Sequence, residues 1–238
     1  MNRASKYNKR SVAFIRLRFF VCYNTTMQDL GTLYVVATPI GNLEDITLRA
    51  LRILKEVDVI LCEDTRTTKV LLEKYDISNL TMSYNAHATD GRETRIINML
   101  KDGKDIALVS DAGTPTISDP GVMLISNIRK AFGEDAKIVP IPGPSALITA
   151  LCASGISSAE FVFLGFLPHK KGRETLFKEI ASSKRVNVFY ESTHRLMKTL
   201  ESLKLYAPQR NIVVGKELTK QFEQFISGSP EYVLNYFK

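Results

Sequence analysis

A short apolar run followed by a loop rich in glycine and proline most constrains the fold of this chain. Residues Ile106–Val109 are all apolar, as in a strand buried on both faces of a parallel sheet. The next twelve residues, Ser110–Gly121, contain two Gly and two Pro and cannot continue that strand. Asp119 and Pro120 are typical of a helix N-cap and first position, which predicts a helix over 121–132. Open α/β sheets bind ligands at such strand ends.

The same alternation of apolar runs, breaking loops and amphipathic segments extends through the first 153 residues. We predict strands at 33–38, 57–62, 81–84, 106–109 and 137–141, and helices at 48–55, 67–75, 90–100, 121–132 and 146–153. Leu48, Leu51 and Leu54 are expected to form the buried face of the first helix, and 146–153 to be a short buried helix. This order favours an α/β fold with a mostly parallel N-terminal sheet.

A second, smaller domain is expected in the last third of the chain. Residues 153–158 are small and polar, which is typical of a linker. Beyond them we predict strands at 161–165, 186–190, 212–214 and 224–226, and helices at 174–182, 194–203 and 230–236. We therefore expect an N-terminal α/β domain at 27–153 and a mixed α/β C-terminal domain at 159–238.

Six of the seven net positive charges lie in the N-terminal extension. Residues 1–26 hold six basic residues and no acidic one, and the remaining 26 basic residues nearly balance the 25 acidic ones. Bulk charge is therefore no argument for nucleic-acid binding by the folded part. We interpret Met27 as the natural start and the extension as disordered or spuriously translated. A transit peptide and a basic RNA-binding arm are the alternatives.

The cysteines and the hydropathy exclude several classes of protein. Cys22, Cys62 and Cys152 are isolated, and the latter two lie in apolar contexts typical of buried free thiols. We see no metal site, and no apolar run approaches the roughly 18 residues that span a bilayer. A cytoplasmic protein is expected.

Three loops that follow predicted strands contain six of the nine prolines, and we expect them to line one pocket. These loops carry carboxylates but no Lys or Arg, and the chain contains neither GxGxxG nor GxxxxGK[ST]. A dinucleotide or nucleoside triphosphate is therefore disfavoured. Carboxylates, hydroxyls and backbone amides suit a ligand with ribose hydroxyls, an amino group and a cationic centre, and S-adenosylmethionine has all three.

Seven motifs, in order, carry a close resemblance to one family: LYVVATPIGNLEDITLRAL, CEDTRTT, ALVSDAGTPTISDPG, IPGPSALITAL, FVFLGFLPHKKG, FYESTHRL and KELTK. From about Leu33 to Phe237 the chain resembles the ribosomal RNA small subunit methyltransferase I family of the tetrapyrrole methylase superfamily. The resemblance implies S-adenosylmethionine-dependent 2′-O-methylation of a cytidine in small-subunit (16S) ribosomal RNA near the decoding centre. It also implies a two-domain tetrapyrrole-methylase-like fold with the cofactor in the inter-domain cleft, and a homodimer.

The resemblance further assigns residues to the cofactor pocket. They are Pro39, Gly41, Asn42, Ser110, Asp111, Ala112, Gly113, Thr114, Ser118, Asp119, Pro120, Gly121, Pro142, Gly143, Pro144, Ser145 and Ala146. Thr67 stands where many members carry His, and Thr116 stands where Gly is common. Members usually continue past the position of Lys238, so we expect the C-terminal domain to lack its closing strands.

Catalytic and RNA-binding candidates come from charged residues in the same motifs. A carboxylate or a neutral lysine can accept the proton of a ribose hydroxyl, and the candidates are Asp64 first, then Glu63, Lys216 and Glu217. RNA contacts are assigned to Arg66, His87, Lys170, Lys171, Arg173, His194 and Arg195. Solvated or salt-bridged surface charge is the alternative for each. Two other functions stay open: a corrin or porphyrin methyltransferase, and a non-catalytic cofactor- or RNA-binding module.

Overall fold

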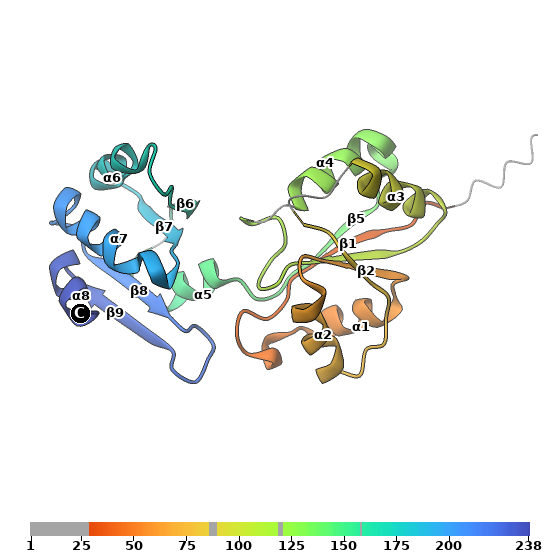
Figure 1. Cartoon of the computed structure of the whole chain (residues 1–238), viewed down its shortest axis with the longest axis horizontal. Coiled ribbons are helices and arrows are strands. Elements are labelled where there is room, and N and C mark those ends of the chain that lie inside the picture. Colours follow the sequence, from red (N-terminus) through yellow and green to blue (C-terminus); the bar gives the residue numbers. More distant parts are fainter. Residues whose placement is uncertain (1–28, 86–89, 119–120, 158) are drawn as a thin grey trace, which may run out of the picture.

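The computed structural model of the chain describes residues 29–85, 90–118, 121–157 and 159–238 (Figure 1). The extension at 1–26 and the predicted site residues His87, Asp119 and Pro120 lie outside the described residues.

Five parallel strands form the first sheet, in the order β3-β2-β4-β1-β5. They are β1 Leu33–Val36, β2 Val59–Cys62, β3 Thr81–Ser83, β4 Ile106–Val109 and β5 Ile138–Ile141. Every residue of β2 and β4 is buried, as expected for central strands with helices on both faces. The predicted parallel α/β sheet is confirmed.

Helices cover both faces of this sheet (Figure 1). The helices α1 Leu48–Glu56 and α2 Thr65–Lys74 lie on one face, and α3 Asp90–Lys101 and α4 Gly121–Phe132 on the other. Two 3-10 turns, η1 Leu43–Asp45 and η2 Gly133–Asp135, lead into α1 and out of α4. Each face therefore has its own buried hydrophobic cluster.

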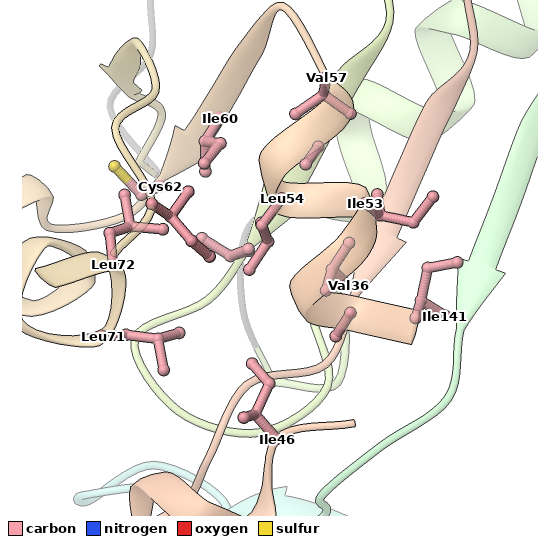
Figure 2. Close-up of a cluster of buried hydrophobic side chains, with 14 residues drawn as sticks. Val36, Ile46, Ile53, Leu54, Val57, Ile60, Cys62, Leu71, Leu72 and Ile141 are labelled. Carbon is pink, nitrogen blue, oxygen red and sulfur yellow. The ribbon is translucent and has the colours of Figure 1, made fainter. Parts of the chain in front are cut away.

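The buried face of the first helix matches the predicted one only in part. Thr47 caps α1 by accepting a hydrogen bond from the backbone N–H of Ala50 at 3.1 Å. Leu54 packs in the cluster that Figure 2 shows, together with Ala50 and Ile53. Leu48, which we expected on the buried face, is 87% exposed. Its position directly after the cap points it away from the sheet.

The rest of the chain builds a second α/β unit around two small sheets. Strand β6 Phe161–Phe166 pairs in parallel with β7 Val186–Tyr190, and β8 Ile212–Lys216 pairs antiparallel with β9 Gln224–Gly228. The helices α6 Arg173–Ser182, α7 Thr193–Tyr206 and α8 Pro230–Tyr236 pack against these strands around a third hydrophobic cluster. Mixed strand pairing was predicted for this part and is confirmed.

The connecting helix α5, Ala146–Ala153, is only partly buried, so the prediction of a buried helix is wrong. Leu147 is its only buried residue, and Ile148 is 53% exposed. The reason is its place: α5 joins the two units and borders the cleft between them, so no sheet face covers it. Cys152 on this helix is exposed, contrary to expectation, whereas Cys62 is buried. Burial raises the pKa of the Cys62 thiol.

Candidate functional site

The centre of the candidate site is the crevice between β1 and β4. These strands are neighbours, but the chain leaves β1 toward α1 on one face of the sheet and leaves β4 toward α4 on the other (Figure 1). The two loops therefore diverge at the carboxyl edge of the sheet. Such a switch point opens a crevice, and α/β proteins bind ligands there.

Hydrogen bonds tie the three predicted loops together at this edge. Thr38 and Gly113 exchange backbone hydrogen bonds of 2.9 and 3.0 Å, which join the loops after β1 and β4. The hydroxyl of Thr38 also donates to the carbonyl of Ser110 at 3.0 Å. The Thr114 hydroxyl donates to the carbonyl of Pro144 at 3.2 Å, which adds the loop after β5. The three loops thus form one continuous wall.

Backbone conformation explains one glycine of this wall, and close packing explains another. Gly113 has φ of +84°, in the left-handed region that favours glycine. A Cβ at Gly143 would lie 3.0 Å from the Cβ of Ala37, closer than ordinary contact. Two non-glycine residues, Thr116 and Ser118, also have positive φ values of 75° and 71°. Such conformations are costly and cluster at functional sites.

The wall borders a large cleft of about 1390 Å³ that lies between the two units. Eight of the predicted cofactor residues line it: Ser110, Asp111, Ala112, Gly113, Thr114, Ser118, Ser145 and Ala146. Opposite them are Phe166, Tyr190 and Glu191 of the second unit, none of which we predicted. The cleft exceeds the roughly 300–1000 Å³ of usual small-molecule sites, so it can hold more than one small molecule.

Other predicted cofactor residues shape the wall without lining the cleft. They are Pro39, Gly41, Asn42, Gly121, Pro142, Gly143 and Pro144. From the loop after β1, Ile40 lines the cleft instead. The side chain of Asn42 accepts a hydrogen bond from Glu44 N–H and caps η1. Gly41 faces the turn between β8 and β9, where an added Cβ would lie 3.0 Å from the carbonyl oxygen of Leu218.

Three of the four catalytic candidates line the cleft, namely Glu63, Lys216 and Glu217. Asp64 instead caps α2 and accepts a hydrogen bond from Arg66 N–H at 2.8 Å. The Arg66 guanidinium lies 2.6 Å from the Asp64 carboxylate and, together with the backbone hydrogen bond, lowers the pKa of Asp64 to about 2. A carboxylate of that pKa is a weak proton acceptor at neutral pH.

The RNA-binding candidates divide into exposed and buried residues. Lys170, Lys171 and His194 are exposed, and so is Arg66, although its guanidinium is paired with Asp64. Arg173 is only 8% exposed. Its guanidinium and that of Arg195 are paired with Glu191 inside the second unit, so these two residues are less suited to bind RNA phosphates than the exposed lysines.

Glu191 is the centre of the network that holds both arginines, and its side chain is 6% exposed. Its carboxylate lies 2.6 Å from Arg195 and 3.8 Å from Arg173 and accepts a hydrogen bond from the Thr199 hydroxyl at 2.6 Å. Arg173 donates to the same hydroxyl at 2.6 Å and to the carbonyl of Pro168 at 3.0 Å. The network therefore fixes the segment that leads to the exposed lysines.

The chemistry of the wall suits a polar ligand that carries positive charge. The segments 38–47, 110–118 and 142–146 contain carboxylates, hydroxyls and backbone amides but no Lys or Arg. Within the described part of the chain, no group of three or more His, Cys, Asp and Glu residues could hold a metal ion. In the same part, no helix is long and apolar enough to cross a membrane.

Comparisons with known proteins agree with this architecture. The family described as tetrapyrrole (corrin/porphyrin) methylases matches residues 32–231. A protein of Halalkalibacterium halodurans named ribosomal RNA small subunit methyltransferase I is 47% identical over 209 residues, covering 87% of this chain and 71% of the relative. The protein of that name in Thermotoga maritima is 44% identical over 209 residues, covering 88% of this chain and 93% of the relative.

A solved structure shares the fold at low sequence identity. The uroporphyrin-III C-methyltransferase of Thermus thermophilus complexed with S-adenosylhomocysteine superposes with a TM-score of 0.59 at 16% identity, over 87% of this chain and 91% of the other. The predicted tetrapyrrole-methylase-like fold is confirmed. The chain belongs to the tetrapyrrole methylase family and, within it, to the ribosomal RNA small subunit methyltransferase I family.

Proposed function

We propose that this protein transfers a methyl group from S-adenosylmethionine to the 2′-hydroxyl of a cytidine in small-subunit ribosomal RNA. The observation that carries the proposal is the continuous wall of three hydrogen-bonded loops, free of Lys and Arg, facing a cleft of about 1390 Å³. Relatives named ribosomal RNA small subunit methyltransferase I, at 44–47% identity over most of the chain, support the substrate. The substrate in turn favours a cytoplasmic enzyme.

The residues of the wall fit the proposed cofactor. The loops Ser110–Thr114 and Ser145–Ala146 offer hydroxyls and backbone amides for ribose and carboxylate groups, and no cation of the loops would repel a sulfonium. Ser118 lies near the second unit, because a Cβ at Gly165 would be 3.2 Å from its hydroxyl oxygen. S-adenosylmethionine bound there would supply an electrophilic methyl group. The structural relative complexed with S-adenosylhomocysteine has the same fold.

The protein's own part in the reaction is mainly to position the substrates. The 2′-oxygen gains the methyl group, its proton leaves to a base, and S-adenosylhomocysteine is the second product. Holding the ribose oxygen in line with the methyl group contributes up to about 7–11 kcal/mol. Glu63, Lys216 and Glu217 line the cleft and are the candidate bases, and Asp64 is the weakest candidate because its carboxylate is paired with Arg66.

The RNA is proposed to cross the mouth of the cleft near Lys170 and Lys171. These exposed lysines follow Leu167 and Pro168, whose carbonyls accept hydrogen bonds from Arg195 and Arg173. The hydrogen bonds hold the start of the loop that carries the lysines in place. Arg66 and His194 remain further candidates for RNA contact. We also propose a homodimer, and separate domains at 27–153 and 159–238. No buried cluster of the described residues contains side chains from both parts.

The proposal is tested by tritiated methyl transfer from S-adenosylmethionine to small-subunit particles that lack the modification. The expected product is a single 2′-O-methylcytidine, located by mapping the RNA. A porphyrin or corrin precursor, offered in parallel, should accept no label and cause no spectral shift on binding. Label in the tetrapyrrole, or none in the particles while the protein binds S-adenosylhomocysteine, would overturn the proposal.

A further inference from the structure

A second, smaller cavity adjoins the main cleft on the side of α2. Its volume is about 290 Å³, and two of its lining residues, Ser110 and Asp111, also line the main cleft. The other lining residues are Thr38, Pro39, Leu43, Thr67, Thr68, Val70 and Leu71. The cavity thus borders the loop after β4, and a ligand bound in the cleft could extend a group into it. Pro39, Ser110 and Asp111 belong to the predicted cofactor residues, and the other six lining residues have no ligand assigned above.

The size and walls of this cavity fit one flat ring. A volume of about 290 Å³ is at the lower end of small-molecule sites, too small for a whole nucleoside cofactor. Pro39 and Leu43 come from the segment after β1, and Val70 and Leu71 come from α2, so apolar side chains of two elements line it. The polar lining residues are Thr38, Thr67, Thr68, Ser110 and Asp111. A heterocyclic base has the matching character: apolar faces and a polar edge.

Asp111 is a fixed hydrogen-bond acceptor at the junction of the two cavities. The backbone N–H of Asp64 donates to its Oδ1 at 3.0 Å, which orients the carboxylate. Within the described part of the chain, no Lys, Arg or His lies within 4.0 Å of it, whereas the nearby Asp64 is paired with Arg66. A carboxylate that is oriented but unpaired is suited to bind a donor from a ligand.

We propose that this cavity binds the cytosine base of the acceptor nucleotide, with Asp111 as the residue that selects cytidine. Carboxylates accept from the N4 amino group of cytosine, and uracil carries an acceptor oxygen at that position. The Thr67 hydroxyl serves as a donor toward the ring nitrogen or carbonyl of the same edge. Enzymes that modify single nucleotides commonly take the target out of its stack into such a pocket. The inference rests on the proposed function and adds the location of the base and the basis of its selection.

A variant that fills the cavity tests the location. Val70 lines it and is 58% exposed, so Val70→Trp adds a bulky ring with little risk to folding. We expect kcat/KM for the particle to fall by about tenfold or more, with an unchanged dissociation constant for S-adenosylhomocysteine. Lys69→Trp, one residue earlier on α2 and outside both cavities, is the matched control and should stay within about twofold of wild type.

A variant of the carboxylate tests the selection. The wild-type protein should methylate cytidine in preference to uridine placed at the target position, and Asp111→Asn should reduce that preference by about tenfold or more. Full activity of Val70→Trp would overturn the location. A preference that Asp111→Asn leaves intact while S-adenosylhomocysteine binding weakens would assign Asp111 to the cofactor and overturn the selection. Either result leaves methylation of cytidine by the wild type, and so the proposed function, standing.

Discussion

The buried Glu191 network allows a sharp test of how burial changes the value of an ion pair. Glu191 lies 2.6 Å from Arg195, and both side chains are largely buried, at 6% and 17% exposed. Glu56 lies at the same distance of 2.6 Å from Arg52 on α1, but those side chains are 55% and 57% exposed. Both are pairs of a glutamate with an arginine four residues away. The two pairs differ in burial, and Glu191 in addition contacts Arg173 and Thr199.

Glu191→Ala should destabilise the second unit by about 3–5 kcal/mol, because it leaves two guanidiniums buried without their carboxylate. Glu56→Ala should cost only about 0.3–0.5 kcal/mol, because water screens the exposed pair. The larger loss is a substantial fraction of the roughly 5–15 kcal/mol that stabilises an ordinary domain.

The assay is urea unfolding followed by far-UV circular dichroism, since the chain has no Trp to serve as a fluorescent probe. The slope of the transition must be compared between variants, so that a change in midpoint reports stability alone. Thr199→Val removes the hydroxyl that links Glu191 to Arg173 and should give an intermediate loss of about 1–3 kcal/mol. A loss for Glu191→Ala no larger than that of Glu56→Ala would refute the reasoning, because equal costs would mean that the network is not desolvated.

Three further predictions concern RNA binding, acid stability and the contact between the units. Replacing Lys170 and Lys171 with Ala should weaken RNA binding and reduce the slope of log affinity against log salt concentration by about 1.4. Unchanged binding across a salt series would contradict a role of these lysines in RNA binding. The pKa of Asp64 is lowered to about 2 in the folded protein, so the ion pair of Asp64 with Arg66 stabilises the fold above about pH 4. This stabilisation is lost as the pH falls toward about 2. Asp64→Asn should therefore flatten the pH dependence of the unfolding free energy between about pH 4 and 2, and it should retain most of the turnover. Gly41→Ala should displace the turn between β8 and β9 and weaken binding of S-adenosylhomocysteine in calorimetry, whereas Gly91→Ala, with open space around it, should not.

The parallel sheet was the most predictable part of the structure. Strand β4 at Ile106–Val109 and helix α4 at Gly121–Phe132 have the predicted limits, and so does helix α8 at Pro230–Tyr236 in the second unit. Buried parallel strands are continuous apolar runs, and the glycine and proline of the flanking loops end them abruptly. These signals are local in the sequence. The joining of the three loops could be inferred as well, since the carboxyl ends of parallel strands lie at one edge.

Burial of individual side chains was less predictable, because it depends on partners that are distant in the sequence. Arg173 belongs to a basic run next to Lys171, and nothing local distinguishes it from a surface charge. Its partners Glu191 and Thr199 come from another strand end and another helix. Cys152 lies among apolar residues but on a helix that connects two units, so no sheet covers it. Apolar neighbours in the sequence do not guarantee a buried position in the fold.

Arg173 and Arg195 support the segment that leads to the exposed lysines. Arg195 donates to the carbonyl of Leu167 at 2.9 Å and Arg173 to that of Pro168 at 3.0 Å, so two consecutive carbonyls at the end of β6 are held from within. The loop that follows presents its two lysines at the surface. A flexible loop would lose conformational entropy when its lysines bind phosphate, and a loop fixed in advance avoids much of that cost. Of the four basic residues, Lys170 and Lys171 are thus exposed charges, and Arg173 and Arg195 support the segment that carries them.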